Sequence, residues 1–343
     1  MTCFVIAEAG VNHNGDIQLA KELVRAAVDV GADAVKFQTF TAEKLVNASA
    51  EKAEYQKSTT GHGSQFQMLK ALELNESMHI ELMDLCVGLG IEFMSTGFDE
   101  ESIDFLVKLG VKRLKIPSGE ITNFSLLTHM AKYDLPMILS TGMSDLVEVD
   151  EAIVKIQEVR NQAEFKQALS KVLTILHCTS NYPADFSDVN LRALNTLSQH
   201  TQLPVGYSDH TAGILIAPLA VALGATVIEK HFTLDKSLPG PDHLSSLEPN
   251  EFKMMMTHIR QTELSLGDGI KAPRDSELPV RDLVRRSVTI KRNLKKGSEL
   301  QVEDLELLRP GSGIEPKHLN SVIGKAIKID LQAGTTLRWE DLI

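Results

Sequence analysis

Two histidines in this sequence have the residue type and placement to bind a metal ion. His210 and His231 each follow a short β-rich run, so both imidazoles could reach one point. Two imidazoles with oxygen or water ligands suit a borderline divalent ion such as Mn²⁺, Fe²⁺, Co²⁺ or Zn²⁺. Such an ion could polarise an aldehyde carbonyl as a Lewis acid. Two unlinked histidines can equally be hydrogen-bonded structural groups, so the pair alone leaves both interpretations open.

Two lysines lie inside apolar runs, where an unpaired ammonium is costly. Lys36 and Lys115 could reach solvent or pair with a carboxylate, or they could bind the phosphate and carboxylate of an anionic substrate. A Schiff-base lysine of a class I aldolase is a third interpretation. Hydroxyls after neighbouring runs could bind the same anion, although such residues are commonly helix N-caps. They are Thr96, Ser118, Ser140 and Ser208.

Further polar side chains occupy similar places. Glu8, Gln38 and Glu229 lie at or just beyond the ends of β-rich runs. The rigid turn PGPDH at 239–243 presents Asp242 beyond the last run, although by itself it is only a turn. Any one of these residues is more readily explained as structural, but so many converging polar ends favour a site.

The elements that would position these residues are a repeated strand and helix. Gly31, Gly90, Gly110 and Gly224 each end a helical stretch just before the next strand, as helix C-caps do. Eight such units in about 250 residues predict a closed (β/α)8 TIM barrel, whose active site lies at the carboxyl ends of the strands. An open doubly wound sheet is the alternative, but no Gly-rich dinucleotide motif follows the first strand. The expected strands are 4–7, 34–37, 91–94, 113–116, 136–139, 173–176, 204–207 and 226–229, and the expected helices are 19–30, 76–89, 101–109, 146–159, 191–197, 214–223 and 251–266.

The chain changes character after the last of these helices. We expect a catalytic barrel over 1–268, a polar linker over 269–285 and a small β-rich domain over 286–343. Short strands and turns are expected around 287–290, 294–297, 309–311 and 331–334. A domain of this size buries little core, so we expect it to lean on its own barrel or on a partner subunit.

Composition excludes several classes of protein. The formal net charge of −11 argues against a broad surface for nucleic acid or an anionic membrane. No apolar run approaches the roughly 20 residues of a membrane helix, and the N-terminus lacks the basic region of a signal peptide. The three widely spaced cysteines fit reduced thiols. These features predict a cytoplasmic protein that binds neither nucleic acid nor membrane.

A series of motifs, in order along essentially the whole chain, resembles the sialic acid synthase family. In that family a phosphoenolpyruvate-condensing barrel precedes an antifreeze-like (SAF) domain. The motifs are AEAGVNHNG at 7–15, VKFQT at 35–39, KIPSGE at 115–120, LSTGM at 139–143, HCTSNYP at 177–183, GYSDHT at 206–211, EKHFT at 229–233, GPD at 240–242, KKG at 295–297 and RPGSG at 309–313.

The resemblance implies a role for each matching residue. It implies that His210 and His231 bind a divalent metal, Mn²⁺ before Mg²⁺ or Co²⁺, and that Glu8 and Glu229 are the catalytic carboxylates. The residues implied to hold phosphoenolpyruvate are Lys36, Thr96, Lys115, Ser118, Ser140 and Ser208. Those implied on the amino-sugar side are Gln38, Tyr182, Asp242 and Arg309. The resemblance further implies a homodimer, in which the C-terminal domain covers the partner's barrel and contributes Arg309.

The implied reaction condenses phosphoenolpyruvate with N-acetylmannosamine to give N-acetylneuraminate and phosphate by C–O cleavage. The motifs at 8–15 and 207–211 are at least as similar to N,N'-diacetyllegionaminate synthases, which use 2,4-diacetamido-2,4,6-trideoxymannose. Ser180 stands where some members have Asn, which puts a direct amide contact in doubt. A non-catalytic sugar-binding protein on the same fold is the alternative from another class. It predicts the loss of a metal ligand or an anion-binding residue, and none is missing from the motifs.

Overall fold

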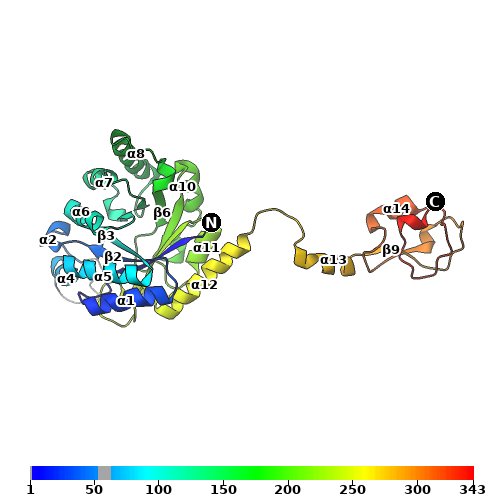
Figure 1. Cartoon of the computed structure of the whole chain (residues 1–343), viewed down its shortest axis with the longest axis horizontal. Coiled ribbons are helices and arrows are strands. Elements are labelled where there is room, and N and C mark those ends of the chain that lie inside the picture. Colours follow the sequence, from blue (N-terminus) through cyan, green and yellow to red (C-terminus); the bar gives the residue numbers. More distant parts are fainter. Residues whose placement is uncertain (1, 53–62) are drawn as a thin grey trace. The chain divides into compact units, whose positions relative to one another are not determined.

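The chain forms two compact units. The structure is a computed structural model that describes residues 2–52 and 63–343. The first unit ends at Gly267 and the second begins at Asp268 (Figure 1). Each unit has its own apolar core.

Eight parallel strands of the first unit close into a barrel, because β8 pairs with β1. This confirms the predicted (β/α)8 fold and excludes the open sheet. The strands are β1 Phe4–Gly10, β2 Ala34–Thr39, β3 Glu92–Gly97, β4 Leu114–Ile116, β5 Met137–Ser140, β6 Leu173–Cys178, β7 Val205–Asp209 and β8 Val227–His231.

Most strands run further toward their carboxyl ends than the sequence predicts. β1 continues to Gly10, β6 to Cys178 and β8 to His231. Most of the expected strands end just before a polar residue, but in the barrel such residues still pair with a neighbouring strand. Glu8, for example, lies opposite Lys36 of β2 and His231 of β8. Polar side chains at the open end are therefore held by the sheet.

Helices surround the barrel, and the segments expected to be helical are helical (Figure 1). Gly90 and Gly110 end α5 and α6 with left-handed backbone, as their positions predict. No helix in the described part of the chain is long and apolar enough to cross a membrane. The helices of this unit are α1 Ile17–Asp29, α2 Ala42–Leu45, α4 Gln65–Ala71, α5 Glu76–Leu89, α6 Glu100–Leu109, α7 Phe124–Ala131, α8 Leu146–Gln162, α9 Leu169–Val172, α10 Ala193–Thr201, α11 Ile216–Ala222 and α12 Pro249–Leu266, with short turns η1 Ser118–Glu120, η2 Phe186–Asp188 and η3 His243–Ser245.

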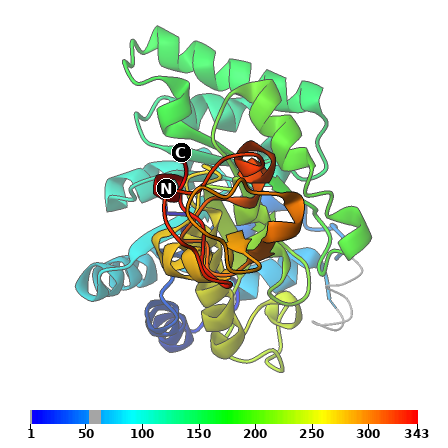
Figure 2. The same cartoon turned by 90° about the vertical axis from the view of Figure 1, so that its right-hand side faces the viewer.

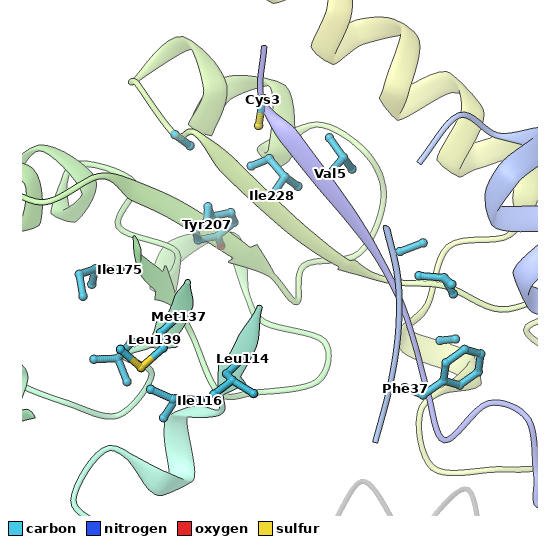
Figure 3. Packing of buried hydrophobic residues seen from close by; sticks show 14 of the residues in the cluster. Cys3, Val5, Phe37, Leu114, Ile116, Met137, Leu139, Ile175, Tyr207 and Ile228 are labelled. Carbon is cyan, nitrogen blue, oxygen red and sulfur yellow. The ribbon is translucent and has the colours of Figure 1, made fainter. Parts of the chain in front are cut away.

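Alternation along each strand sorts the side chains into two layers. Outward residues form the main core between strands and helices; Val5, Phe37, Leu114, Leu139 and Ile228 are among those shown in Figure 3. Inward residues form a small apolar cluster inside the barrel, made of Ile6, Ala34, Met94, Ile138, Leu176 and Val227 with Phe4 packed against it. On each strand the next residue that points inward lies two positions further along the chain. In most of the strands this residue is polar.

The second unit holds two antiparallel strands, β9 Ser287–Ile290 and β10 Leu305–Leu308, among turns (Figure 2). The segments expected near 294 and 331 meet through a single bridge, Leu294 to Leu331. Part of the expected linker is helical, as η4 Asp275–Glu277 and α13 Leu278–Val284. The other elements are η5 Val302–Asp304, η6 Pro316–His318, α14 Leu319–Val322 and η7 Trp339–Asp341.

Candidate active site

A cavity of about 510 Å³ opens at the carboxyl ends of the barrel strands. Its floor is polar because most of the inward residues above the apolar cluster in the barrel carry polar groups. Every barrel residue that the sequence singled out lines it. These residues are Glu8, Lys36, Gln38, Thr96, Lys115, Ser118, Ser140, Tyr182, Ser208, His210, Glu229, His231 and Asp242.

Two ammonium groups and two carboxylates share the floor of this cavity. Lys36 Nζ lies 2.6 Å from Glu8 Oε2 and 3.8 Å from Glu229 Oε2. Lys115 Nζ lies 3.8 Å from the other oxygen of Glu229. All four side chains are buried, so each charge is balanced by a near neighbour and not by water. A dianionic substrate placed here would compete with the two carboxylates for the same two cations.

The two carboxylates differ in charge environment. Burial raises the pKa of Glu8 to about 7, although Lys36 opposes this effect. Burial also acts to raise the pKa of Glu229, but Lys115 and Lys36 outweigh it and lower that pKa below its ordinary value. Glu8 is therefore poised to gain or lose a proton near neutral pH, whereas Glu229 stays ionised.

The lysines differ in the same way. Burial acts to lower the pKa of Lys36, but Glu229 and Glu8 outweigh it and raise that pKa. Burial lowers the pKa of Lys115, and its nearest carboxylate, Glu229 at 3.8 Å, is too distant to outweigh this effect. Both ammonium groups donate to hydroxyls as well: Lys36 to Thr96 at 2.9 Å and Lys115 to Ser140 at 2.8 Å. These hydroxyls thus hold the lysine side chains in place.

Ser118 is held by the backbone of another loop. The Gly142 N–H donates to Ser118 Oγ at 2.9 Å, and Cys178 Sγ lies 3.2 Å from the same oxygen. A Cβ on Gly142 would lie 2.9 Å from Ser118 Oγ and 2.2 Å from Ser180 Oγ. Gly142 is therefore required for close packing of these polar groups and not for its backbone angles.

The two histidines both line the cavity, with ring centroids 5.6 Å apart. His210 Nδ1 lies 2.7 Å from the Thr179 carbonyl oxygen, so this nitrogen donates and Nε2 keeps its lone pair. Nδ1 of His231 is buried without a hydrogen-bond partner. Burial lowers the pKa of His210 to about 4 and that of His231 well below its usual value of 6.5. Both imidazoles are neutral, which is the form that binds metals.

These donors fit the divalent ion that the sequence predicts. Neutral imidazoles with free lone pairs suit Mn²⁺, Fe²⁺, Co²⁺ or Zn²⁺. No group of three or more His, Cys, Asp or Glu residues in the described chain could by itself hold a metal. The remaining ligands would then be water or substrate oxygen atoms.

Two of the barrel residues predicted to bind the sugar lie beside the histidines, and the third, Gln38, lies beside Glu8. The Tyr182 ring lies 4.2 Å from the His210 ring between centroids, and Asp242 Oδ2 lies 3.8 Å from His231 Nδ1. Gln38 Nε2 donates to Glu8 Oε1 at 3.4 Å. Burial raises the pKa of Asp242 to about 6.

Two further sequence predictions concern Ser180 and Arg309. Ser180, the departure from the family pattern, also lines the cavity, next to Gly142. Arg309 belongs to the second unit, at the end of β10. Its predicted place over a barrel stays a prediction.

Sequence reasoning missed the apolar side of the cavity. Val11, Phe98 and three residues of α4 and its C-cap, Met68, Leu69 and Leu72, line it there. In the sequence these residues are indistinguishable from the buried face of an ordinary amphipathic helix. Cys178 was also missed as a site residue; its place at an inward position of β6 was the available signal.

The chain is similar to known proteins along its whole length. Residues 23–271 match the model of the NeuB family, and residues 285–343 match that of the SAF domain. The chain is 60% identical over 343 residues to an N,N'-diacetyllegionaminic acid synthase of Legionella pneumophila, covering 100% of this chain and 95% of the relative. It is 32% identical over 340 residues to the N-acetylneuraminate-9-phosphate synthase of Homo sapiens, covering 98% and 92%.

A solved structure is also similar to this chain. The N-acetylneuraminic acid synthetase of Leptospira borgpetersenii is 33% identical and matches with a TM-score of 0.70 over 82% of this chain and 90% of that one. These findings confirm the predicted family, the SAF domain and the synthase class. The chain therefore belongs to the NeuB family, whose members are transferases that use phosphoenolpyruvate to make nonulosonic acids.

Proposed function

We propose that this chain condenses phosphoenolpyruvate with 2,4-diacetamido-2,4,6-trideoxymannose to give N,N'-diacetyllegionaminate and phosphate. The observation that carries the choice of sugar is the 60% identity, over the whole chain, to a relative named for this product. Identity to the human N-acetylneuraminate-9-phosphate synthase is only 32%. Of the two sugars left open by the sequence, the comparisons therefore favour the diacetamido sugar over N-acetylmannosamine.

Lys36 and Lys115 would bind the phosphate and carboxylate of phosphoenolpyruvate, with hydroxyl contacts from the surrounding serines and Thr96. Their place on the floor supports this role, because both point to one space and each already balances a carboxylate. Each lysine is also tied to a hydroxyl, which favours a fixed anion-binding group over a Schiff-base nucleophile. The serines are Ser118, Ser140 and Ser208.

The chemistry that we propose balances as follows. C3 of phosphoenolpyruvate forms a bond to the aldehyde carbon of the open-chain sugar, and positive charge develops at C2. Water adds at C2, and the C–O bond to phosphate then breaks, leaving the keto acid and inorganic phosphate. A divalent ion on His210 and His231, which we take to be Mn²⁺, would polarise the aldehyde when bound.

The carboxylates would act on the charge and the proton. Glu229 stays ionised and can stabilise positive charge at C2 electrostatically. Glu8, whose pKa is raised to about 7, is the better group to take the proton from the attacking water. Tyr182 and Asp242 beside the histidines, and Gln38 beside Glu8, would orient the sugar.

We further propose that the chain is a cytoplasmic homodimer in which the SAF domain of one subunit covers the barrel of the other. The buried, free cysteines Cys3, Cys86 and Cys178 support a reducing compartment. Arg309→Ala should then weaken sugar binding while phosphoenolpyruvate binding is kept. Unchanged affinity for both substrates would contradict this arrangement.

Phosphate release in the presence of Mn²⁺ tests the proposed reaction, with mass spectrometry of the sugar product. Bridging ¹⁸O in phosphoenolpyruvate should appear in the released phosphate, because the C–O bond breaks. Label retained in the keto acid would refute the cleavage that we propose. A non-catalytic sugar-binding protein would release no phosphate with any aldehyde.

A further inference from the structure

One side of the active-site cavity is an apolar wall, defined here as Val11, Met68, Leu69, Leu72 and Phe98. Met68, Leu72 and Val11 are buried, and they form one apolar cluster with Phe40. Leu69 and Phe98 are half-buried and pack against this cluster. The wall thus presents hydrocarbon to a cavity whose floor is otherwise charged.

The apolar wall is fixed in place by its own packing. Helix α4 begins with a capping box, in which Ser64 Oγ accepts from the Gln67 N–H at 3.2 Å. Its last residue, Ala71, lies so close to Gly15 that a Cβ there would come within 2.5 Å of the Ala71 carbonyl oxygen. Phe98 stacks edge-on against Phe40, with centroids 6.0 Å apart. Helices α2 and α4 also pack side by side (Figure 1). A fixed apolar surface of this kind disfavours an added hydroxyl by a moderate factor, on the order of 100-fold at most.

The apolar wall adjoins the polar groups that we assign to the sugar. A Cβ on Gly10 would lie 3.4 Å from Gln38 Nε2 and 3.7 Å from Asp242 Oδ2, so both side chains gather around this residue. Val11, the next residue, is the first member of the apolar wall. A sugar held by Gln38 and Asp242 would therefore extend along the apolar wall.

We propose that the apolar wall is the specificity element that receives the C6 methyl of the sugar and selects 6-deoxy over 6-hydroxy substrates. The inference rests on the proposed function and deepens it. The aldehyde at C1 belongs near His210 and His231 on β7 and β8, whereas α4 precedes β3 on another side of the barrel. C6 is the opposite end of the open chain from C1. The C6 methyl is also the one substituent of the sugar's carbon chain without a polar atom, whereas each acetamido group carries an N–H and a carbonyl.

The preference for a 6-deoxy sugar follows from the cost of removing water from a 6-hydroxyl. A 6-hydroxyl against the apolar wall would lose its water without gaining a strong partner, because no member of the wall has a nitrogen or oxygen atom in its side chain. A packed apolar pocket distinguishes substituents of this size by roughly tenfold or more. Polar loops in the same place would hydrogen-bond the 6-hydroxyl or leave it hydrated, and would give no such preference.

The test compares two sugars that differ only at C6: 2,4-diacetamido-2,4,6-trideoxymannose and 2,4-diacetamido-2,4-dideoxymannose. For each enzyme the ratio of the two kcat/KM values is measured by phosphate release with Mn²⁺. The key variant is Leu69→Gln, which keeps the size of a half-buried side chain and adds polar atoms. Leu69→Met keeps the surface apolar. Leu45→Gln is the matched control, since Leu45 packs on the same cluster but does not line the cavity.

We expect the wild type to prefer the 6-deoxy sugar by about tenfold or more, and Leu69→Gln to reduce the ratio to within about threefold of unity. Leu69→Met and Leu45→Gln should keep the wild-type ratio. Because the ratio is taken within one preparation, partial misfolding of a variant cancels. A ratio unchanged in Leu69→Gln, or lost equally in Leu45→Gln, overturns the assignment of the wall. A wild type active on the diacetamido sugars without a C6 preference also overturns it and leaves the proposed function intact. No phosphate release with either sugar instead refutes the proposed function, and this inference with it.

Discussion

Gly142 offers the sharpest test of how the phosphoenolpyruvate site is built, because its missing side chain leaves room for three polar groups. In Gly142→Ala the new Cβ would lie 2.2 Å from Ser180 Oγ and 2.9 Å from both Cys178 Sγ and Ser118 Oγ. Atoms cannot approach so closely, so these side chains must move. Ser118 would then lose the hydrogen bond from the backbone of residue 142 and leave its place on the cavity floor.

The expected change in the KM for phosphoenolpyruvate follows from the loss of the hydrogen bond between Ser118 and this substrate. A hydrogen bond to a charged group contributes about 1.5–3 kcal/mol, which corresponds to roughly 10- to 150-fold in affinity. We therefore expect the KM for phosphoenolpyruvate to rise by at least about tenfold. The KM for the sugar should change much less, since the residues assigned to the sugar are not among those that a Cβ at residue 142 would meet.

Initial rates of phosphate release at varied phosphoenolpyruvate measure this effect, with thermal unfolding to check the fold. Gly119→Ala is the matched control, because Gly119 also lines the cavity but a Cβ there would meet nothing within 4 Å. A KM for phosphoenolpyruvate that stays within twofold of wild type in Gly142→Ala would refute the role of Ser118. Equal effects of the two substitutions would refute the steric argument.

Three further predictions concern the metal, the lysines and acid stability. Chelation should abolish phosphate release and Mn²⁺ should restore it, whereas His231→Ala should lose both the activity and the bound metal measured by elemental analysis; full metal content in this variant would contradict the site. Borohydride with pyruvate should leave Lys36 and Lys115 unmodified by mass spectrometry, and a reduced adduct on either would favour a Schiff base. Burial lowers the pKa of His13 from 6.5 to about 4, so below pH 6.5 the unfolded state binds a proton that the folded state does not. The unfolding free energy of the wild type should therefore fall by about 3 kcal/mol from this group as the pH falls from above 6.5 to 4. In His13→Gln the unfolding free energy should fall correspondingly less over this range. Equal pH slopes of the two proteins would exclude His13 as a source.

The barrel was predictable because its periodicity is local. Each buried strand reads as an apolar run, and glycines such as Gly90 and Gly110 mark where helices end. The residues at which helices begin and end were less predictable. Helix α10 begins later than expected and continues to Thr201, because it has no capping side chain at its start and ends at Gln202 in the left-handed region without a glycine.

The floor of the site was predictable for a related reason. Alternation along a strand fixes which side chains point inward, so Glu8, Lys36 and Glu229 had to meet once the barrel closed. The apolar wall was not predictable, because Met68 and Leu72 look like any core-facing residues of a short helix. Only the packed structure separates a helix that covers the core from one that lines the cavity.

A competition experiment in one vessel tests the proposed function most directly. Wild-type enzyme with Mn²⁺ and phosphoenolpyruvate receives equal concentrations of 2,4-diacetamido-2,4,6-trideoxymannose and N-acetylmannosamine, and the two nonulosonic acids are quantified by mass spectrometry. The ratio of products at early times equals the ratio of kcat/KM values. We predict that N,N'-diacetyllegionaminate predominates by at least about tenfold. An excess of N-acetylneuraminate, or neither product, would contradict the proposed function.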